Sequence, residues 1–124
     1  MNQKTIFMVA AVINFIFGIF VLLIPETFTS YYGNTLSVGG VYFARLWAAS
    51  VIGLAVMLWL ARDAGASQAL RAIIVASFVY VLIGLIVAIL SQINGMANAL
   101  GWTTVLLYLI FTLAFGYLML KKPA

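Results

Sequence analysis

The chain has 124 residues, of which 67% are hydrophobic and 6% are charged, and its formal net charge is +4. Since a soluble domain carries roughly 25% charged residues, this composition excludes a water-soluble globular protein and predicts an integral membrane protein. The chain has no cysteine and no histidine, and its only side-chain carboxylates are Glu26 and Asp63. The usual metal and haem ligands and paired acid–base groups are therefore missing. We expect a protein that is not an enzyme and that has no metal and no cofactor. The six Lys and Arg residues form no cluster, which argues against a nucleic-acid partner.

The first predicted span covers residues 5–24, where Asn14 interrupts the apolar run and Pro25 ends it. A transmembrane helix needs about 20 apolar residues, and the apolar part of a cleaved signal peptide is shorter, so we expect a retained span. Asn14 lies at mid-span, where an amide is expected to hydrogen-bond a neighbouring helix.

The segment after this span, residues 25–40, is the longest connection and is rich in aromatic side chains. One interpretation is an interfacial, partly helical segment that lies on the lipid surface. The other is a lid over an outward-facing cavity. We favour the first, and the sequence leaves both open.

Three further apolar stretches predict spans at residues 41–61, 72–90 and 99–120, joined by the short polar connections 61–69 and 91–98. A spanning segment must satisfy its own backbone hydrogen bonds in lipid, so each is expected to be a helix. The whole chain, residues 1–124, is thus predicted to form one all-α transmembrane domain, an antiparallel four-helix bundle.

Each predicted span carries a row of small or polar residues spaced by four, which places each row on one helix face. Small residues let helices approach closely and polar ones hydrogen-bond across the interface, so we expect the four rows to face each other. The rows are Ala10, Asn14 and Gly18; Arg45, Ala49 and Gly53; Ala76, Tyr80, Gly84, Ala88 and Gln92; and Thr104, Tyr108, Thr112 and Gly116.

Basic residues indicate the orientation in the membrane. With four spans, five of the six fall on one side, and Arg45 alone falls towards the other. These five are Lys4, Arg62, Arg71, Lys121 and Lys122. Cytoplasmic loops carry the excess of Lys and Arg, so both termini are predicted to be cytoplasmic.

Arg45 and Glu26 lie at similar depths near the outer boundary. One interpretation is that Arg45 reaches the headgroups or pairs structurally with Glu26. The other is an anion or lipid-headgroup site in which Arg45 is the cation, with Gln92, Asn94, Asn98 and Thr104 as its polar neighbours.

Three polar residues, Asn14, Tyr80 and Tyr108, are expected at comparable depths within the membrane. We interpret them as intramembrane polar contacts between helices. A transport pathway through the same groups is the less favoured alternative.

The order of these features resembles a group of small bacterial four-span membrane proteins that includes the DoxX-like proteins. The resemblance is carried by NFIFG at 14–18, the stop at Pro25 and Glu26, ARLWAAS at 44–50 and GYLML at 116–120. It implies a location in the bacterial inner membrane, and it implies no particular activity or functional residue.

Two functional hypotheses follow. The first is an accessory or scaffolding subunit that acts through helix–helix contacts, either as a homo-oligomer or within a larger membrane complex. The alternative is a minimal transporter, or a protein that binds lipid or a small anion, with an outward-facing site around Arg45. Membrane lipid is an expected partner in both.

Overall fold

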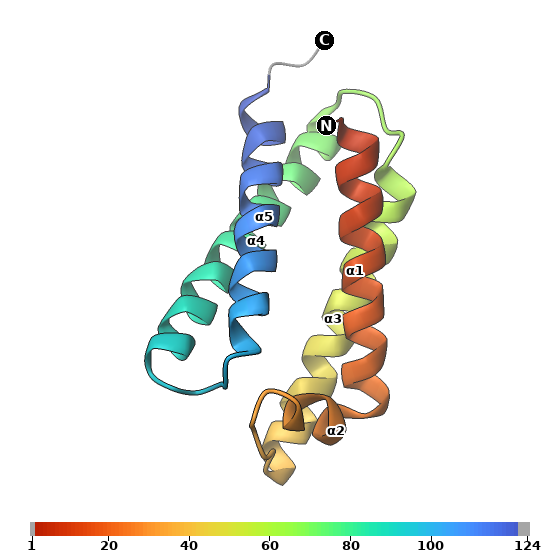
Figure 1. The fold of residues 1–124 in the computed structure, drawn as a ribbon. Coiled ribbons are helices and arrows are strands. Elements are labelled where there is room, and N and C mark those ends of the chain that lie inside the picture. The colour runs from red at the N-terminus through yellow and green to blue at the C-terminus, as the bar shows by residue number, and fades with distance from the viewer. Residues whose placement is uncertain (1, 122–124) are drawn as a thin grey trace.

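The computed structural model describes residues 2–121 and contains four helices long and apolar enough to cross a membrane (Figure 1). They are α1 (Gln3–Leu23), α3 (Val38–Ala61), α4 (Gln68–Ile93) and α5 (Gly101–Leu120), and the short helix α2 (Pro25–Ser30) lies between α1 and α3. The long helices alternate in direction along the chain. The predicted all-helical, antiparallel four-helix bundle is therefore confirmed.

The helices α3 and α4 begin before the predicted spans because serine side chains cap them. The Ser37 hydroxyl accepts a hydrogen bond from the Gly40 amide at 3.0 Å, and the Ser67 hydroxyl accepts one from the Leu70 amide at 3.0 Å. Such caps satisfy amides that have no partner within the helix. Hydropathy marks only the lipid-crossing part of a helix, so for these two helices it places the beginning too far inward.

The four long helices form two antiparallel pairs, α1 with α3 and α4 with α5 (Figure 1). Contact between the two pairs is sparse and is made mainly by α1 against α5. The predicted rows pack within the pairs in three of four helices. A Cβ on Gly18 would lie 2.7 Å from Ile52 of α3, and one on Gly84 would overlap the Tyr108 ring of α5. Glycine at these two positions therefore permits close approach.

The prediction was wrong for α3, where Arg45, Ala49 and Gly53 are exposed. The buried residues of this helix are instead Ala48, Val51, Ala55 and Leu58. Their alternating spacing of three and four follows the 3.5-residue repeat of closely packed, nearly parallel helix axes. Ala49 directly follows Ala48, about 100° further round the helix, and Gly53 is two positions from both Val51 and Ala55, so the expected row lies off this seam. A spacing of four alone does not identify which face is buried.

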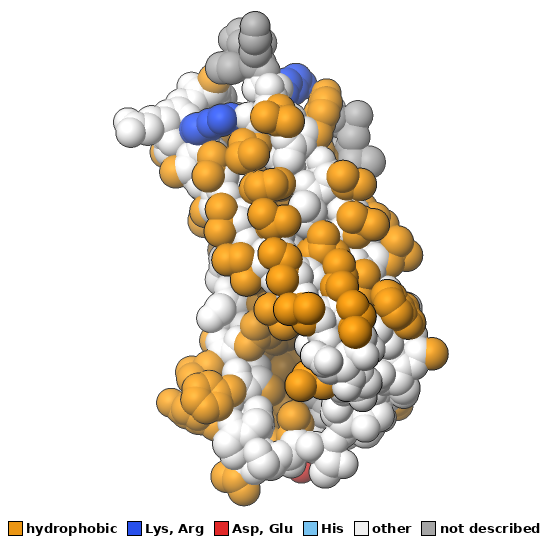
Figure 2. Space-filling model, turned by 90° about the vertical axis from the view of Figure 1, so that its left-hand side faces the viewer, with side chains coloured by type: hydrophobic (Ala, Val, Ile, Leu, Met, Phe, Trp, Pro, Cys, Tyr) orange, Lys and Arg blue, Asp and Glu red, His pale blue; other side chains and the backbone are white. Residues whose placement is uncertain are grey.

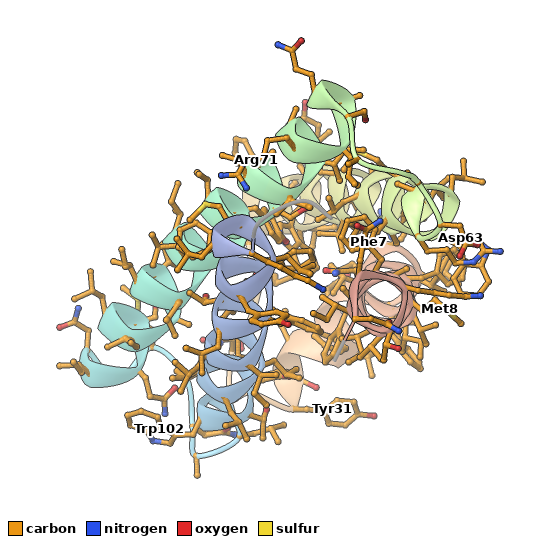
Figure 3. The ribbon with its side chains drawn as sticks, turned by 90° about the horizontal axis from the view of Figure 1, so that it is seen from above. Phe7, Met8, Tyr31, Asp63, Arg71 and Trp102 are labelled. Carbon is orange, nitrogen blue, oxygen red and sulfur yellow. The ribbon has the colours of Figure 1, made fainter. Side chains whose placement is uncertain are left out.

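A core of buried apolar side chains joins all four helices at the end of the molecule where the chain begins. Its largest members are Phe7 and Phe115, whose ring centroids lie 6.0 Å apart between α1 and α5. Figure 3, which looks along the helices, shows Phe7 on the side of α1 that faces the rest of the bundle. The two helix pairs therefore pack against each other at this end.

This same end carries the basic residues, and it is called the basic end below; the opposite end, with α2 and residues 94–100, is called the loop end. Lys4 and Arg62 both pair with Asp63, at 3.6 and 3.7 Å, and Arg71 donates to the Met119 carbonyl. Figure 2 shows Lys and Arg side chains at one end of a face that is otherwise broadly apolar. Lys122 lies outside the described residues, and the membrane side of either end stays a prediction.

Candidate functional site

The half of the bundle nearer the loop end holds a cavity of about 540 Å³ between the two helix pairs. Its walls come from α1, α4 and α5, and Trp47 of α3 and residues of the 25–40 segment complete it. The cavity begins where the core ends, since Val81 and Phe111 belong to both. Along the α4 wall, Gly84 lets the Tyr108 ring lie directly against the helix, and Ala88 contributes only a methyl group.

Polar groups line the deep part of the cavity, near the middle of the helices. The rings of Tyr80 and Tyr108 lie 6.3 Å apart at an angle of 54°, and Asn14 lines the cavity from α1. The Asn14 amide nitrogen donates to the Ala10 carbonyl of its own helix at 2.7 Å. The Tyr80 hydroxyl is buried beside the polar groups of Tyr108 and Trp47, but it forms no hydrogen bond of good geometry with a described residue. Within residues 2–121, the hydrogen bond from Asn14 to a neighbouring helix that the sequence predicts is therefore not formed.

The 25–40 segment covers the loop end of the cavity with aromatic side chains. Phe28 of α2 packs edge-to-face on Phe17 of α1, with centroids 5.7 Å apart, and lies 5.5 Å from Tyr32. All three rings line the cavity. The segment is partly helical, as predicted, and it also occupies the position expected of a lid.

Asn98 ties this segment to the turn between α4 and α5. Its backbone amide donates to the Tyr32 carbonyl at 2.9 Å, and its side-chain amide donates to the Tyr31 carbonyl at 3.0 Å. Gln92, which lines the cavity, donates to the Asn98 carbonyl at 2.9 Å. Gly33 follows with a φ of +82°, a conformation that favours glycine, and packs against the Asn98 side chain. The two helix pairs are thus linked across the loop end by a short hydrogen-bonded strap, residues 31–33 with Asn98.

The candidate ligand residues from the sequence do not come together. Gln92 and Thr104 line the cavity, whereas Arg45 and Glu26 do not. The Arg45 side chain is exposed and donates to the Leu22 carbonyl of α1 at 3.2 Å. Arg45 and Glu26 form no ion pair within residues 2–121. Among the described residues that line the cavity, none carries a charge.

Sequence reasoning missed Trp47, two positions beyond Arg45 and therefore on another face of α3. It also missed the contribution of the 25–40 aromatics. The predicted rows on α4 and α5 did include residues that line the cavity, namely Tyr80, Gly84, Ala88 and Gln92 of α4 and Thr104 and Tyr108 of α5. Depth in the membrane was readable from the sequence, but the direction in which the α3 residues point was not.

The cavity opens sideways, towards the position that lipid would occupy. Ile83 and Val87 of α4 each line it yet are 56% exposed, and Trp47 of α3 lines it and is 38% exposed. A side chain that both lines a cavity and remains exposed lies at its mouth. An opening therefore lies between α3 and α4, on the apolar sides of both helices, and the exposed lining residue Asn34 marks a second, polar edge of the cavity at the loop end.

Comparison of the chain with known protein families, with characterised proteins and with solved structures gives no match. The resemblance to the DoxX-like group therefore stays a prediction. What the site can do is argued below from its geometry and chemistry.

Proposed function

We propose that the protein binds an uncharged, mostly apolar molecule from the bilayer in the cavity between its two helix pairs. The observation that carries this proposal is the cavity itself, about 540 Å³ in volume and lined by apolar walls with polar groups at its deep end. Ligand pockets are typically about 300–1,000 Å³, mostly apolar, with a few polar groups that orient the ligand. The cavity has these properties.

The lining favours a neutral ligand. A charged group moved into an apolar site without a partner carries a desolvation cost of several kcal/mol or more. No described lining residue is charged, and Arg45, the cation of the sequence-based alternative, donates to Leu22 outside the cavity. A binding function therefore suits a neutral molecule better than the small anion first considered.

The sideways opening favours a ligand dissolved in the membrane. Trp47, Ile83 and Val87 at the mouth are all apolar or aromatic, and such a mouth gives an apolar molecule a path that avoids water. At the loop end, by contrast, α2 and the strap cover most of the cavity, and the lining residue left exposed there, Asn34, is polar. We place the protein in the bacterial inner membrane with both termini cytoplasmic, supported by the basic residues gathered at one end.

An accessory or scaffolding role is the second candidate, and one observation favours it. Arg45, Ala49 and Gly53 form an exposed row on α3, and a Cβ added to Gly53 would meet nothing within 4 Å. A small-residue face lets a second helix approach closely. The row therefore suits contact with another copy of the chain or with a larger membrane protein.

One experiment separates the two candidates. The protein is purified in a mild detergent and its intact mass is measured with bound molecules retained, alongside Ala88→Phe, which fills the cavity, and Gly53→Leu, which changes only the exposed row. The binding proposal expects one neutral lipid-like molecule per chain, lost in Ala88→Phe and kept in Gly53→Leu. A defined oligomer without any ligand, broken by Gly53→Leu and kept in Ala88→Phe, would overturn it in favour of the scaffolding role.

A further inference from the structure

Two buried hydroxyl groups in the described chain have no hydrogen-bond partner, those of Ser77 and Tyr80. They lie three residues apart on α4, and only Tyr80 lines the cavity. A buried donor without a partner destabilises a folded protein, and such groups are rare in native structures. The Tyr80 hydroxyl is therefore the group at the cavity whose missing partner a ligand can supply.

We propose that Tyr80 binds the polar end of the ligand, and that this end is an uncharged hydroxyl group. This inference rests on the binding function proposed above. The Tyr80 hydroxyl offers a donor, while the Asn14 amide nitrogen is already bonded to Ala10 and no described residue donates to its amide oxygen. These two neighbouring groups at the deep end of the cavity thus offer one donor and one acceptor, and a hydroxyl is the simplest uncharged group that satisfies both.

The depth of Tyr80 restricts the class of ligand further. Tyr80 lies 13 residues before Ile93, the end of α4, which corresponds to about 20 Å along a helix at 1.5 Å per residue. A polar end bound there lies near the middle of the membrane rather than at its surface. Phosphate and zwitterionic headgroups are strongly hydrated and would lose this hydration at that depth. The described lining residues carry no charge that could compensate for the loss. The site therefore selects weakly hydrated alcohols of the membrane over phospholipids.

Trp47 at the cavity mouth provides the reporter for a test. In a background with Trp59→Phe and Trp102→Phe, Trp47 is the single tryptophan. The protein is placed in phosphatidylcholine nanodiscs and titrated with three brominated quenchers: a dibromo-octadecanol, the matching dibromo-octadecane and dibromo-stearate. The variants are Tyr80→Phe and, as the matched control, Ser77→Ala, which removes the unpartnered hydroxyl that does not line the cavity.

We expect that only the octadecanol quenches the Trp47 fluorescence in a saturable way. Its dissociation constant is expected to rise about tenfold in Tyr80→Phe, because roughly one hydrogen bond is lost. Ser77→Ala is expected to leave the dissociation constant unchanged. Since Tyr80→Phe removes an unpartnered buried group, it should unfold no more readily than the parent. If Tyr80 had a purely structural role, Tyr80→Phe would instead lower the free energy of unfolding.

The two proposals fail in different ways. If the parent shows no saturable quenching by any probe, the binding function is overturned. If the octadecanol binds the parent and Tyr80→Phe equally well, or if the octadecane binds as tightly as the octadecanol, the role of Tyr80 is overturned and the binding function stands. If the stearate binds best, the site is cationic, and the proposal of a neutral ligand is overturned.

Discussion

The two halves of this bundle are built from the same four helices but pack in different ways. Near the basic end, Phe7 and Phe115 fill the space between α1 and α5, and a continuous core joins both helix pairs. Near the loop end, a cavity between the same pairs replaces the core, and small side chains such as that of Ala88 line it. The difference follows from which side chains face the gap, since the helices run uninterrupted through both halves.

The comparison shows how a small membrane protein can separate stability from a binding site. Lipid is as apolar as the helix surfaces, so helices associate in a membrane through close packing and hydrogen bonds. The half nearer the basic end supplies the packing. The other half is closed mainly by aromatic contacts of Phe28 and by the hydrogen bonds of Asn98. A cavity in that half therefore removes few of the contacts that hold the two helix pairs together.

The comparison is tested most strongly by Phe7→Ala. Phe7 is fully buried between the pairs, so we expect the free energy of unfolding to fall by about 2–4 kcal/mol, less than in a soluble core because lipid also accepts an apolar ring. The exposed Phe15 of the same helix is the matched control, and Phe15→Ala should be nearly neutral. Steric trapping in lipid measures both. Equal effects would mean that the core near the basic end is not what holds the bundle.

Gly84→Ala tests the α4–α5 contact at the cavity wall. A Cβ at this position would overlap the Tyr108 ring, so we expect a loss of about 2 kcal/mol and displacement of the ring. Gly53→Ala, where a Cβ meets nothing within 4 Å, should be neutral or slightly stabilising, since alanine favours the helix. The same unfolding measurement compares them, and similar losses in both would contradict the packing described.

A pair of identical substitutions compares the two halves directly. Ala11→Leu adds volume to the tightly packed α1, where we expect a loss of about 1–2 kcal/mol. Ala88→Leu adds the same volume beside the cavity, so its stability should stay within about 0.5 kcal/mol of the parent while the cavity shrinks. The outcome is read from unfolding in lipid together with quenching of Trp47. A larger loss at Ala88 would show that the loop half is packed as tightly as the other.

A smaller and more local loss than that of Ala11→Leu is expected for Asn98→Ala. The change removes the side-chain hydrogen bonds to the Tyr31 carbonyl and from the Leu100 amide and keeps the backbone bond to Tyr32. We expect a loss of about 1 kcal/mol, felt locally as faster amide hydrogen exchange in residues 31–34. Exchange in α1 near Phe7 serves as the internal control. If exchange rises throughout the bundle instead, the strap is a global element of the fold rather than a local closure.

Much of the fold was predictable because it depends on length and hydropathy. Four runs of about 20 apolar residues can only be helices in lipid, and short connections make neighbours antiparallel. The three rows that contain Gly18, Gly84 and Gly116 were also identified as packing faces, with the exposed Ala76 as an exception. The fourth row shows that a glycine does not by itself mark close approach, since Gly53 is exposed. These features are local in the sequence.

The candidate site was predicted only in part. Asn14, Tyr80 and Tyr108 were singled out because polar residues in apolar spans are rare, and Gln92 and Thr104 as polar neighbours expected for Arg45. All five line the cavity. Arg45 was singled out for the same reason, yet it lies on the exposed face of α3. Rarity and depth do not reveal direction, which depends on the rotation of each helix about its own axis.

The sequence by itself determined that this is a four-helix membrane protein with its basic residues at one end and a few polar groups at mid-span. Only the tertiary structure decided that the helices join as two pairs, that Ala48, Val51 and Ala55 form the seam of α3, and that the space between the pairs is filled at one end and open at the other. Hydropathy sets which segments enter the membrane. Helix rotation and side-chain packing depend on contacts between residues far apart in the chain, and no single segment carries that information.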